Sequence, residues 1–360
     1  MTNLSDYSKK IFILGCERSG STWLANIFDA HPNVELLMEP FADYACLFRG
    51  FPERNTYLRG IGSELVELLT FGFNRLYNVK YPLFYRPGRW LYLKALDSKI
   101  FSVYNYILQF LGAQAPNRLS QYQLLNLHTS EIPITRQPRK NTFYTHIVTK
   151  ELRLNFKVGL LSKIYPDAKY LVSIRHPGAQ INSILKLFKK GHLGELRKNL
   201  SSFVEYIDQG KRFNNFWHFA CLQDFNNNLE LKLLLWWMIN YTVLIEDLQL
   251  NRLNYRIVYH EELSDTPEKV VLDLFEFCDL NYDEQVKDYV RVSSTEKNST
   301  PSPLNTSRDS ANYYKLAINN VSPTLNEIIQ KVISTMKAEN IEPTLRKYLD
   351  KFYEFGRIRK

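Results

Sequence analysis

The chain has 360 residues, of which 45% are hydrophobic and 23% are charged, the proportions of an ordinary globular protein. Its formal net charge is +9, from 46 Lys and Arg residues against 37 Asp and Glu residues, and this surplus favours anionic ligands. The basic residues occur in pairs but form no long run. A nucleic-acid partner is therefore not expected.

Apolar stretches and cysteines bear on where the protein works. The first ten residues, MTNLSDYSKK, are polar, and the apolar stretch after them covers only residues 11–14, so neither a signal peptide nor a membrane anchor is predicted. Residues 233–245 are too short to span a bilayer and are expected to form a buried helix. The four cysteines lie far apart and the histidines show no metal spacing. We therefore expect a cytoplasmic protein that holds no metal and has no transmembrane segment.

Short apolar runs alternate with helical patterns along the chain, which predicts an α/β fold with a parallel sheet. The expected architecture is a P-loop-like three-layer sandwich, forming one domain over residues 1–360. A helix is expected after the first strand, and another is expected to open at Pro177, a residue favoured in the first helical turn. The central sheet should hold about five strands, at residues 10–15, 34–39, 145–151, 169–175 and 255–261.

Two regions interrupt this alternation. Residues 41–141 are rich in Tyr, Phe and Arg, and residues 189–232 are polar and aromatic. Both are predicted to be insertions over the sheet. In open α/β sheets such segments border the cleft at the carboxyl ends of the strands, where ligands bind, so the two insertions should shape an acceptor site.

The segment GCERSGST, residues 15–22, has the frame of a loop that cradles a phosphate. It joins a buried strand to a helix, so the backbone N–H groups of Gly20, Ser21 and Thr22 should point at an anion, helped by the helix dipole. The nucleotide-hydrolysing form of this loop places Lys directly after the second Gly; here that position is Ser21. Arg18 supplies a fixed positive charge inside the loop. The pattern is therefore unlike that of an ATPase.

A second anion site is predicted at the end of the fourth strand. Arg175 ends that strand, and Ser183 follows eight residues later on the next helix. A guanidinium and a hydroxyl brought together at a carboxyl edge suit a second phosphate.

With these residues in view, the chain resembles the sulfotransferases that use 3′-phosphoadenosine 5′-phosphosulfate (PAPS), and most of all their carbohydrate branch. The resemblance implies that the 5′-phosphosulfate binds to the first motif, which covers Arg18, Ser19, Gly20, Ser21, Thr22 and Trp23. It also implies that Arg175 and Ser183 bind the 3′-phosphate. Arg308, in the segment NTSRDS, is a further candidate for contact with the donor. The resemblance is carried by RSGSTWL, DAHPNVELLMEPF, VTKELRL and YLVSIRHPGAQINS, with a weaker echo in YRIVYHEELSDTPEKV.

Transfer to a hydroxyl requires a general base. Glu39, in MEPF, matches the Glu-Pro of carbohydrate sulfotransferases, and Glu151 and His146 remain alternatives. Lys150 resembles a family lysine that reaches the sulfate, and Arg18 would stabilise charge on the leaving oxygen.

The function expected from this resemblance is sulfuryl transfer from PAPS to a hydroxyl of a carbohydrate or glycolipid. Two alternatives stay open on the residues alone. One is a metal-dependent P-loop nucleotide kinase, which Ser21 disfavours, and the other is a nucleotide-binding protein without enzymatic activity.

Overall fold

The computed structural model describes residues 9–39, 144–191, 193, 196, 200, 228–295, 309–340 and 342–357. The expected insertion at 41–141 lies outside the described residues. Arg308 and most of the expected insertion at 189–232 lie outside them as well. The described residues at the two ends of the second insertion, 189 and 229–232, belong to helices.

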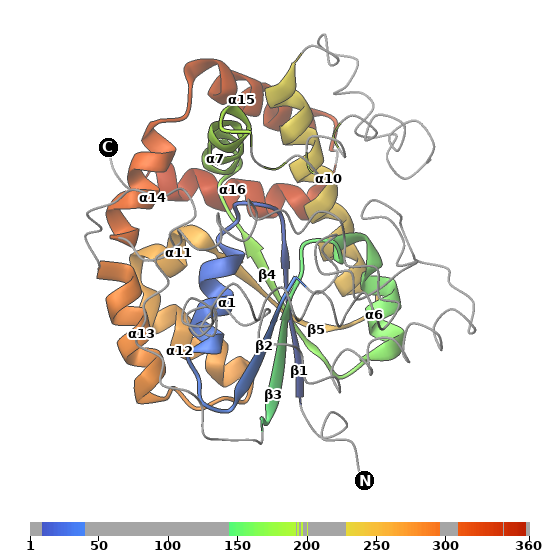
Figure 1. The fold of residues 1–360 in the computed structure, drawn as a ribbon. Helices are drawn as coiled ribbons and strands as arrows, with labels where there is room; N and C mark the ends of the chain where they lie inside the picture. The colour runs from blue at the N-terminus through green and yellow to red at the C-terminus, as the bar shows by residue number, and fades with distance from the viewer. Residues whose placement is uncertain are drawn as a thin grey trace, which may run out of the picture.

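A five-stranded, all-parallel sheet forms the centre of the protein (Figure 1), which confirms the predicted α/β fold. The strands follow the order β2-β3-β1-β4-β5. Their bounds are β1 Lys9–Gly15, β2 Val34–Met38, β3 His146–Lys150, β4 Lys169–Ile174 and β5 Asn254–Tyr259. Since β1 is the middle strand, the loop that leaves it opens at the centre of the carboxyl edge of the sheet.

Side chains of β1 alternate between two cores, as the two-residue period of a strand requires. Ile11 and Ile13 pack into one hydrophobic cluster, and Phe12 and Leu14 pack into the other. All four are essentially inaccessible to solvent. A strand buried on both faces reads as a continuous apolar run, which is why it was visible in the sequence.

Helices cover both faces of the sheet and make the outer layers of the sandwich (Figure 1). One face is covered by α1 (Ser21–Asp29), α12 (Pro267–Phe277) and α13 (Glu284–Thr295), whose apolar residues share a cluster with the sheet. The other face is covered by α6 (Val158–Ile164) and α10 (Leu229–Leu250). Helix α10 is buried along nearly its whole length, as expected for residues 233–245.

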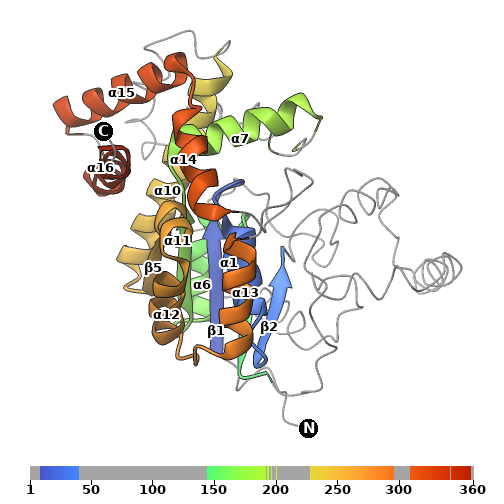
Figure 2. The same cartoon turned by 90° about the vertical axis from the view of Figure 1, so that its left-hand side faces the viewer.

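The segment after β4 and the C-terminal segment meet beyond the carboxyl ends of the strands (Figure 2). Helix α7 (Pro177–Lys189) begins at the predicted Pro177. It contacts α14 (Ser310–Asn319) and α15 (Pro323–Ala338), and α10 contacts α16 (Pro343–Arg357). Within the ranges that the structure describes, no helix has the length and apolar character needed to cross a membrane.

The fifth strand is shorter than predicted. It ends at Tyr259, and residues His260–Asp265 form the short helix α11. The prediction extended the strand to Glu261 because a turn was expected only at the Asp-Thr-Pro that follows. The change matters for the site, since it brings His260 and Glu261 back over the carboxyl edge of the sheet.

Candidate active site

The loop of residues 15–22, called here the phosphate loop, turns sharply between β1 and α1. Gly15 and Gly20 have positive φ angles of 149° and 96°, and Arg18 has a φ of 66°. A Cβ atom on Gly15 would lie 2.5 Å from the carbonyl oxygen of Ser173, and one on Gly20 would lie 2.4 Å from His260 Nδ1. Both positions therefore require glycine, for conformation and for space.

Buried polar side chains hold the start of this loop. Asn155, in the short 3-10 helix η4 (Asn155–Lys157), accepts a hydrogen bond from the Gly15 N–H (3.3 Å) and donates to the Gly15 carbonyl oxygen (2.9 Å). The hydroxyl of Tyr241 accepts from the Cys16 N–H (3.3 Å) and donates to the Ser173 carbonyl oxygen (2.8 Å). The backbone where β1 ends is thus fixed by side chains from two other elements.

The N-terminus of α1 lies directly at the end of the phosphate loop. Gly20 is the N-cap residue in a left-handed conformation, and the first helical bond runs from the Leu24 N–H to the Gly20 carbonyl oxygen. The N–H groups of the first turn therefore have no intrahelical acceptor, and within the described part of the chain no side chain caps Gly20. Such a terminus suits an anion.

The remaining residues of the first motif have different surroundings. Ser19 is fully buried, its N–H donates to the Cys16 carbonyl oxygen (3.2 Å), and its hydroxyl oxygen lies beside Gly15. Ser21 is also buried, whereas Thr22 is exposed. Trp23 points into the core and donates from Nε1 to the hydroxyl of Ser293 (3.0 Å). Trp23 is therefore bonded within the protein interior, whereas the buried hydroxyl of Ser19 has no hydrogen-bond partner among the described residues.

Arg18, Arg175 and Ser183, which the sequence placed in two separate phosphate sites, come together. Arg18 Nε donates to the Ser183 hydroxyl (3.0 Å), and Arg175 Nη1 donates to the carbonyl oxygen of Arg18 (3.2 Å). The Arg18 guanidinium thus leans toward α7, whereas the sequence placed it at the leaving oxygen of the donor. Two cations and a hydroxyl form one positive cluster beside the phosphate loop.

The start of α7 is fixed by a buried acid. Glu261 Oε1 accepts from the His176 N–H (3.0 Å), and Glu261 is 1% exposed. Burial raises the pKa of Glu261 to about 7, although the His176 N–H and the charge of Arg175 act in the opposite direction. Burial, helped by the charge of Arg175, lowers the pKa of His176 to about 4. The neutral imidazole accepts at Nδ1 from the Ala179 N–H (3.4 Å) and so caps the helix.

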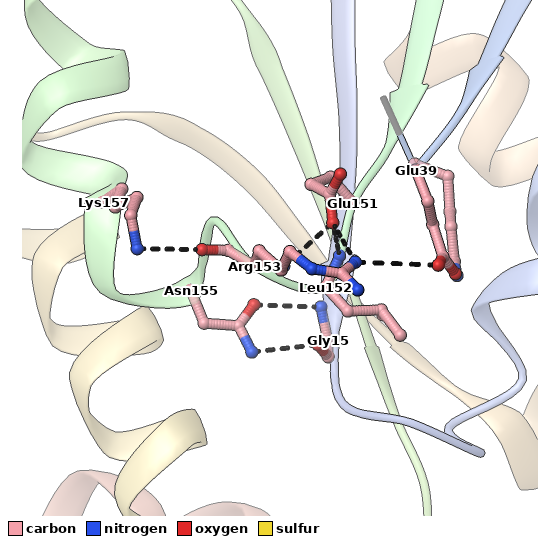
Figure 3. A network of polar contacts seen from close by, with 8 residues as sticks. Gly15, Glu39, Glu151, Leu152, Arg153, Asn155 and Lys157 are labelled. Atoms are coloured by element: carbon pink, nitrogen blue, oxygen red, sulfur yellow. Dashed lines mark hydrogen bonds and ion pairs between the residues drawn. The ribbon is translucent and has the colours of Figure 1, made fainter. Parts of the chain in front are cut away.

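A second charged cluster lies at the ends of β2 and β3 (Figure 3). Glu39 follows β2 with a φ of 46°, and Lys150 Nζ donates to its carboxylate. Arg153 Nη1 lies 3.8 Å from Glu39 Oε2 and 3.2 Å from Glu151 Oε1. The Glu39 side chain keeps 20% of its surface exposed, while that of Lys150 keeps 1%. Glu39 is therefore the most exposed member of the cluster.

The two other candidate bases occupy structural positions. Glu151 is fully buried, and its Oε1 accepts from the N–H groups of Leu152 (2.9 Å) and Arg153 (3.1 Å), so the carboxylate holds the turn after β3. His146 begins β3 and pairs in register with Lys9 and Val34. It lies at the opposite edge of the sheet, about 13 Å along the strand from Lys150. Burial also lowers the pKa of His146 to about 4.

Several site residues were missed by sequence reasoning. Arg153 stands in the quoted VTKELRL segment but was assigned no role, and Asn155 and Tyr241 carry no local signal at all. Their partners lie 140 and 225 residues away in the chain. Within the described ranges, no group of three or more His, Cys, Asp or Glu residues is arranged to hold a metal ion.

Comparison with protein families gives a match over residues 10–284 to the model of the Sulfotransferase family. The chain belongs to the Sulfotransferase family. It is therefore an enzyme, a sulfotransferase that uses PAPS as its sulfuryl donor. The match includes the phosphate loop, both charged clusters and α11, and it ends before α14, α15 and α16.

Similar solved structures are also sulfotransferases. One is a sulfotransferase from Alicyclobacillus acidocaldarius, with 14% identity, 95% of each chain covered and a TM-score of 0.39. Another is the sulfotransferase domain of the Synechococcus PCC 7002 olefin synthase, with 16% identity, 90% of this chain and 94% of that chain covered, and a TM-score of 0.39. A third is a mouse sulfotransferase complexed with PAP, with 10% identity, 97% and 92% covered, and a TM-score of 0.39. No curated protein matches the chain.

Proposed function

We propose that this sulfotransferase transfers the sulfuryl group of PAPS to a hydroxyl of a carbohydrate or glycolipid, with Glu39 as the general base. One observation supports the donor site and the choice of base: the order of groups along the carboxyl edge of the sheet. The acceptor class is proposed from the resemblance of MEPF to the carbohydrate sulfotransferases. Arg175 and Ser183 lie beyond β4, the phosphate loop leaves β1, and Glu39 and Lys150 lie at the ends of β2 and β3. With strands about 4.8 Å apart, Glu39 and Arg175 are separated by three spacings, or about 14 Å.

That order fits an extended donor lying along the edge. The 3′-phosphate would be held by Arg175 and Ser183, and the 5′-phosphosulfate by the N-terminus of α1. The acceptor would then approach from the side of Glu39. Arg18, whose side chain bonds to Ser183 and whose own carbonyl oxygen accepts from Arg175, would contact the donor between its two phosphate ends.

The reaction is an in-line displacement at sulfur. The bond from sulfur to the 5′-phosphate oxygen breaks as a bond from sulfur to the acceptor oxygen forms, and the acceptor proton passes to Glu39. The products are the sulfated acceptor and 3′-phosphoadenosine 5′-phosphate (PAP). Cations near developing charge stabilise the transition state more than the ground state. Lys150 would act in this way at the sulfuryl group, and Arg18, which leans toward Ser183, would act from the side of α7.

Glu39 must first be released from its ion pair. In the structure Lys150 donates to Glu39, and a carboxylate held in this way does not accept a proton readily. We infer that the negative sulfuryl oxygens of the bound donor compete for Lys150. Donor binding would then free Glu39 for the acceptor hydroxyl.

Titration of the purified protein with PAP, with and without EDTA, tests the donor site. We expect binding that does not depend on metal and a loss of about tenfold or more in Arg175→Ala, because a charged contact to phosphate is removed. Arg291→Ala is the matched control, since it removes the same charge from an exposed arginine paired with Asp288. Binding of ATP with Mg²⁺ in place of PAP would favour the kinase alternative.

Glu39→Gln tests the base. We expect PAP affinity to stay within about twofold and turnover with an active acceptor to fall by a factor of 10² to 10⁴, the usual contribution of a general base. Glu284→Gln, an exposed carboxylate paired with Lys287, should leave both unchanged. Undiminished turnover in Glu39→Gln would remove Glu39 from the mechanism. A panel of glycan, glycolipid and phenolic acceptors, read by mass increase, tests the acceptor class.

A further inference from the structure

Gln180 lies in the first part of α7, and its side-chain amide is fully buried. Its Nε2 donates to the carbonyl oxygen of Glu17 in the phosphate loop (2.7 Å). Its Oε1 accepts from the indole Nε1–H of Trp237 in α10 (3.1 Å). A buried amide that is satisfied at both ends is costly to displace. This one side chain therefore ties together three segments that are far apart in the sequence.

The loop segment that it holds is the one that bends. Glu17 directly precedes Arg18, whose φ of 66° places it in the left-handed region that a non-glycine residue rarely adopts. Such a conformation persists only where its surroundings enforce it. Fixing the Glu17 carbonyl from one side fixes the peptide plane that leads into Arg18.

Gln180 also shares a helix with Ser183, the partner of Arg18. The two residues are three positions apart, so they lie on the same side of α7. Gln180 holds the backbone of the loop while Ser183 accepts from the Arg18 side chain (3.0 Å). The loop and α7 are thus joined at two points, the Glu17 carbonyl oxygen and the Arg18 side chain.

The other end of the link is anchored in the core. Trp237 is 1% exposed, and its ring packs against Tyr241 (centroids 4.8 Å apart) and Phe352 (6.3 Å). Tyr241, one helical turn further along, accepts from the Cys16 N–H. Helix α10 thereby grips two consecutive loop residues, Cys16 directly and Glu17 through Gln180.

We propose that Gln180 is a positioning residue of the donor site: it holds the Glu17 peptide so that Arg18 keeps the bent conformation in which its guanidinium meets Ser183. The proposal rests on the proposed function for the identity of the ligand, since PAP is the probe. Its structural half, the restraint of the loop, needs no ligand.

The first experiment measures that restraint in the unliganded protein by hydrogen exchange. Gln180→Met keeps the length of the side chain and removes both hydrogen bonds. Asn182→Leu is the matched control, because Asn182 also donates from its amide to a backbone carbonyl (Asn320, 2.6 Å), but on the side of α14. We expect peptides covering residues 15–22 to exchange about tenfold faster in Gln180→Met and to be unchanged in Asn182→Leu. Equal exchange in Gln180→Met and the unaltered protein would overturn the proposal.

The second experiment is a double-mutant cycle read by PAP affinity. Gln180→Met should weaken PAP binding about tenfold in the unaltered protein, the effect of losing a hydrogen bond that orients a charged contact. In the Arg18→Ala background the same change should cost less than about threefold, because the group that Gln180 positions is already gone. A purely structural role predicts equal losses in both backgrounds, and that result would contradict positioning through Arg18.

The two experiments separate the failure of this inference from that of the proposed function. If the unaltered protein binds no PAP, the proposed donor site fails while the exchange experiment still decides whether Gln180 restrains the loop. If PAP binds and Gln180→Met changes neither affinity nor exchange, only the role of Gln180 is lost.

Discussion

A side chain introduced at either glycine of the phosphate loop would clash with a different part of the protein. A Cβ on Gly20 would strike the His260 ring, whereas one on Gly15 would strike the backbone carbonyl of Ser173. We expect Gly20→Ala to lower the free energy of unfolding by about 1–3 kcal/mol, the range for an enforced backbone strain. Adding His260→Ala should restore part of that loss, because it removes the obstacle. The same addition should not help Gly15→Ala. Urea denaturation of the single and double variants measures both, and equal behaviour of the two glycines would contradict the assigned contacts.

Glu261 gives the protein a pH dependence of known sign. Its pKa is about 7 in the folded state against an ordinary value of 4.5, so the folded state holds a proton that the unfolded chain releases between those values. The contribution of Glu261 to the free energy of unfolding is therefore fully present below pH 4.5 and is lost as the pH rises to about 7.

The variant Glu261→Gln does not titrate. Relative to this variant, the unaltered protein should lose on the order of 3 kcal/mol of unfolding free energy between pH 4.5 and 8. The measurement is the free energy of unfolding of both proteins across this range. Because both contain His146 and His176, the titration of these histidines cancels in the difference. A difference that stays flat with pH would mean that Glu261 is ionised in the folded state throughout.

At the scale of elements, the joint between β1 and η4 depends on Asn155. Its amide satisfies both the N–H and the carbonyl of Gly15 and also donates to Asn240 Oδ1 (3.1 Å). Asn155→Ala leaves these buried groups without their partner, so we expect a loss of about 2–4 kcal/mol in unfolding free energy. Ser162→Ala, in the neighbouring α6 with a partly buried hydroxyl, should change it by less than about 0.5 kcal/mol. Comparable losses in the two variants would argue against a special role for Asn155.

The strands could be predicted from the sequence because each is a buried apolar run, and their observed bounds differ from the predicted ones by one or two residues. Sequence reasoning could single out the charged and glycine residues of the phosphate loop as candidates, and likewise Arg175 and Ser183, because the members of each motif lie within eight positions of one another. Gln180 and Asn155 were not found, because a buried amide looks like any surface amide until its partners are known. Those of Gln180 lie 163 and 57 residues away in the chain. The end of β5 was misplaced because no turn residue separates Tyr259 from HEEL, which folds as the start of α11.

At the scale of the whole molecule, the C-terminal helices belong to the same core as the sheet. Leu345 in α16 is fully buried and shares a cluster with Phe12 of β1 and Trp237 of α10. Leu345→Ala should lower the unfolding free energy by about 2–5 kcal/mol, the cost of a cavity in a packed core. Leu316→Ala, the same change at a residue of α14 that is 58% exposed, is the control. Far-ultraviolet circular dichroism and tryptophan fluorescence should report the same shifted midpoint, and separate midpoints would show that α16 unfolds on its own.

Helix α7 stands between the donor site and those C-terminal helices. Its Gly178 packs so closely that a Cβ there would lie 2.9 Å from Val321 and 3.2 Å from Ile329. Neither Val321 nor Ile329 falls within the family match at residues 10–284. A mutagenesis library for altered donor affinity should therefore yield hits around residues 320–329, in a stretch that contains none of the residues assigned here to the donor. A library restricted to the family match would miss them.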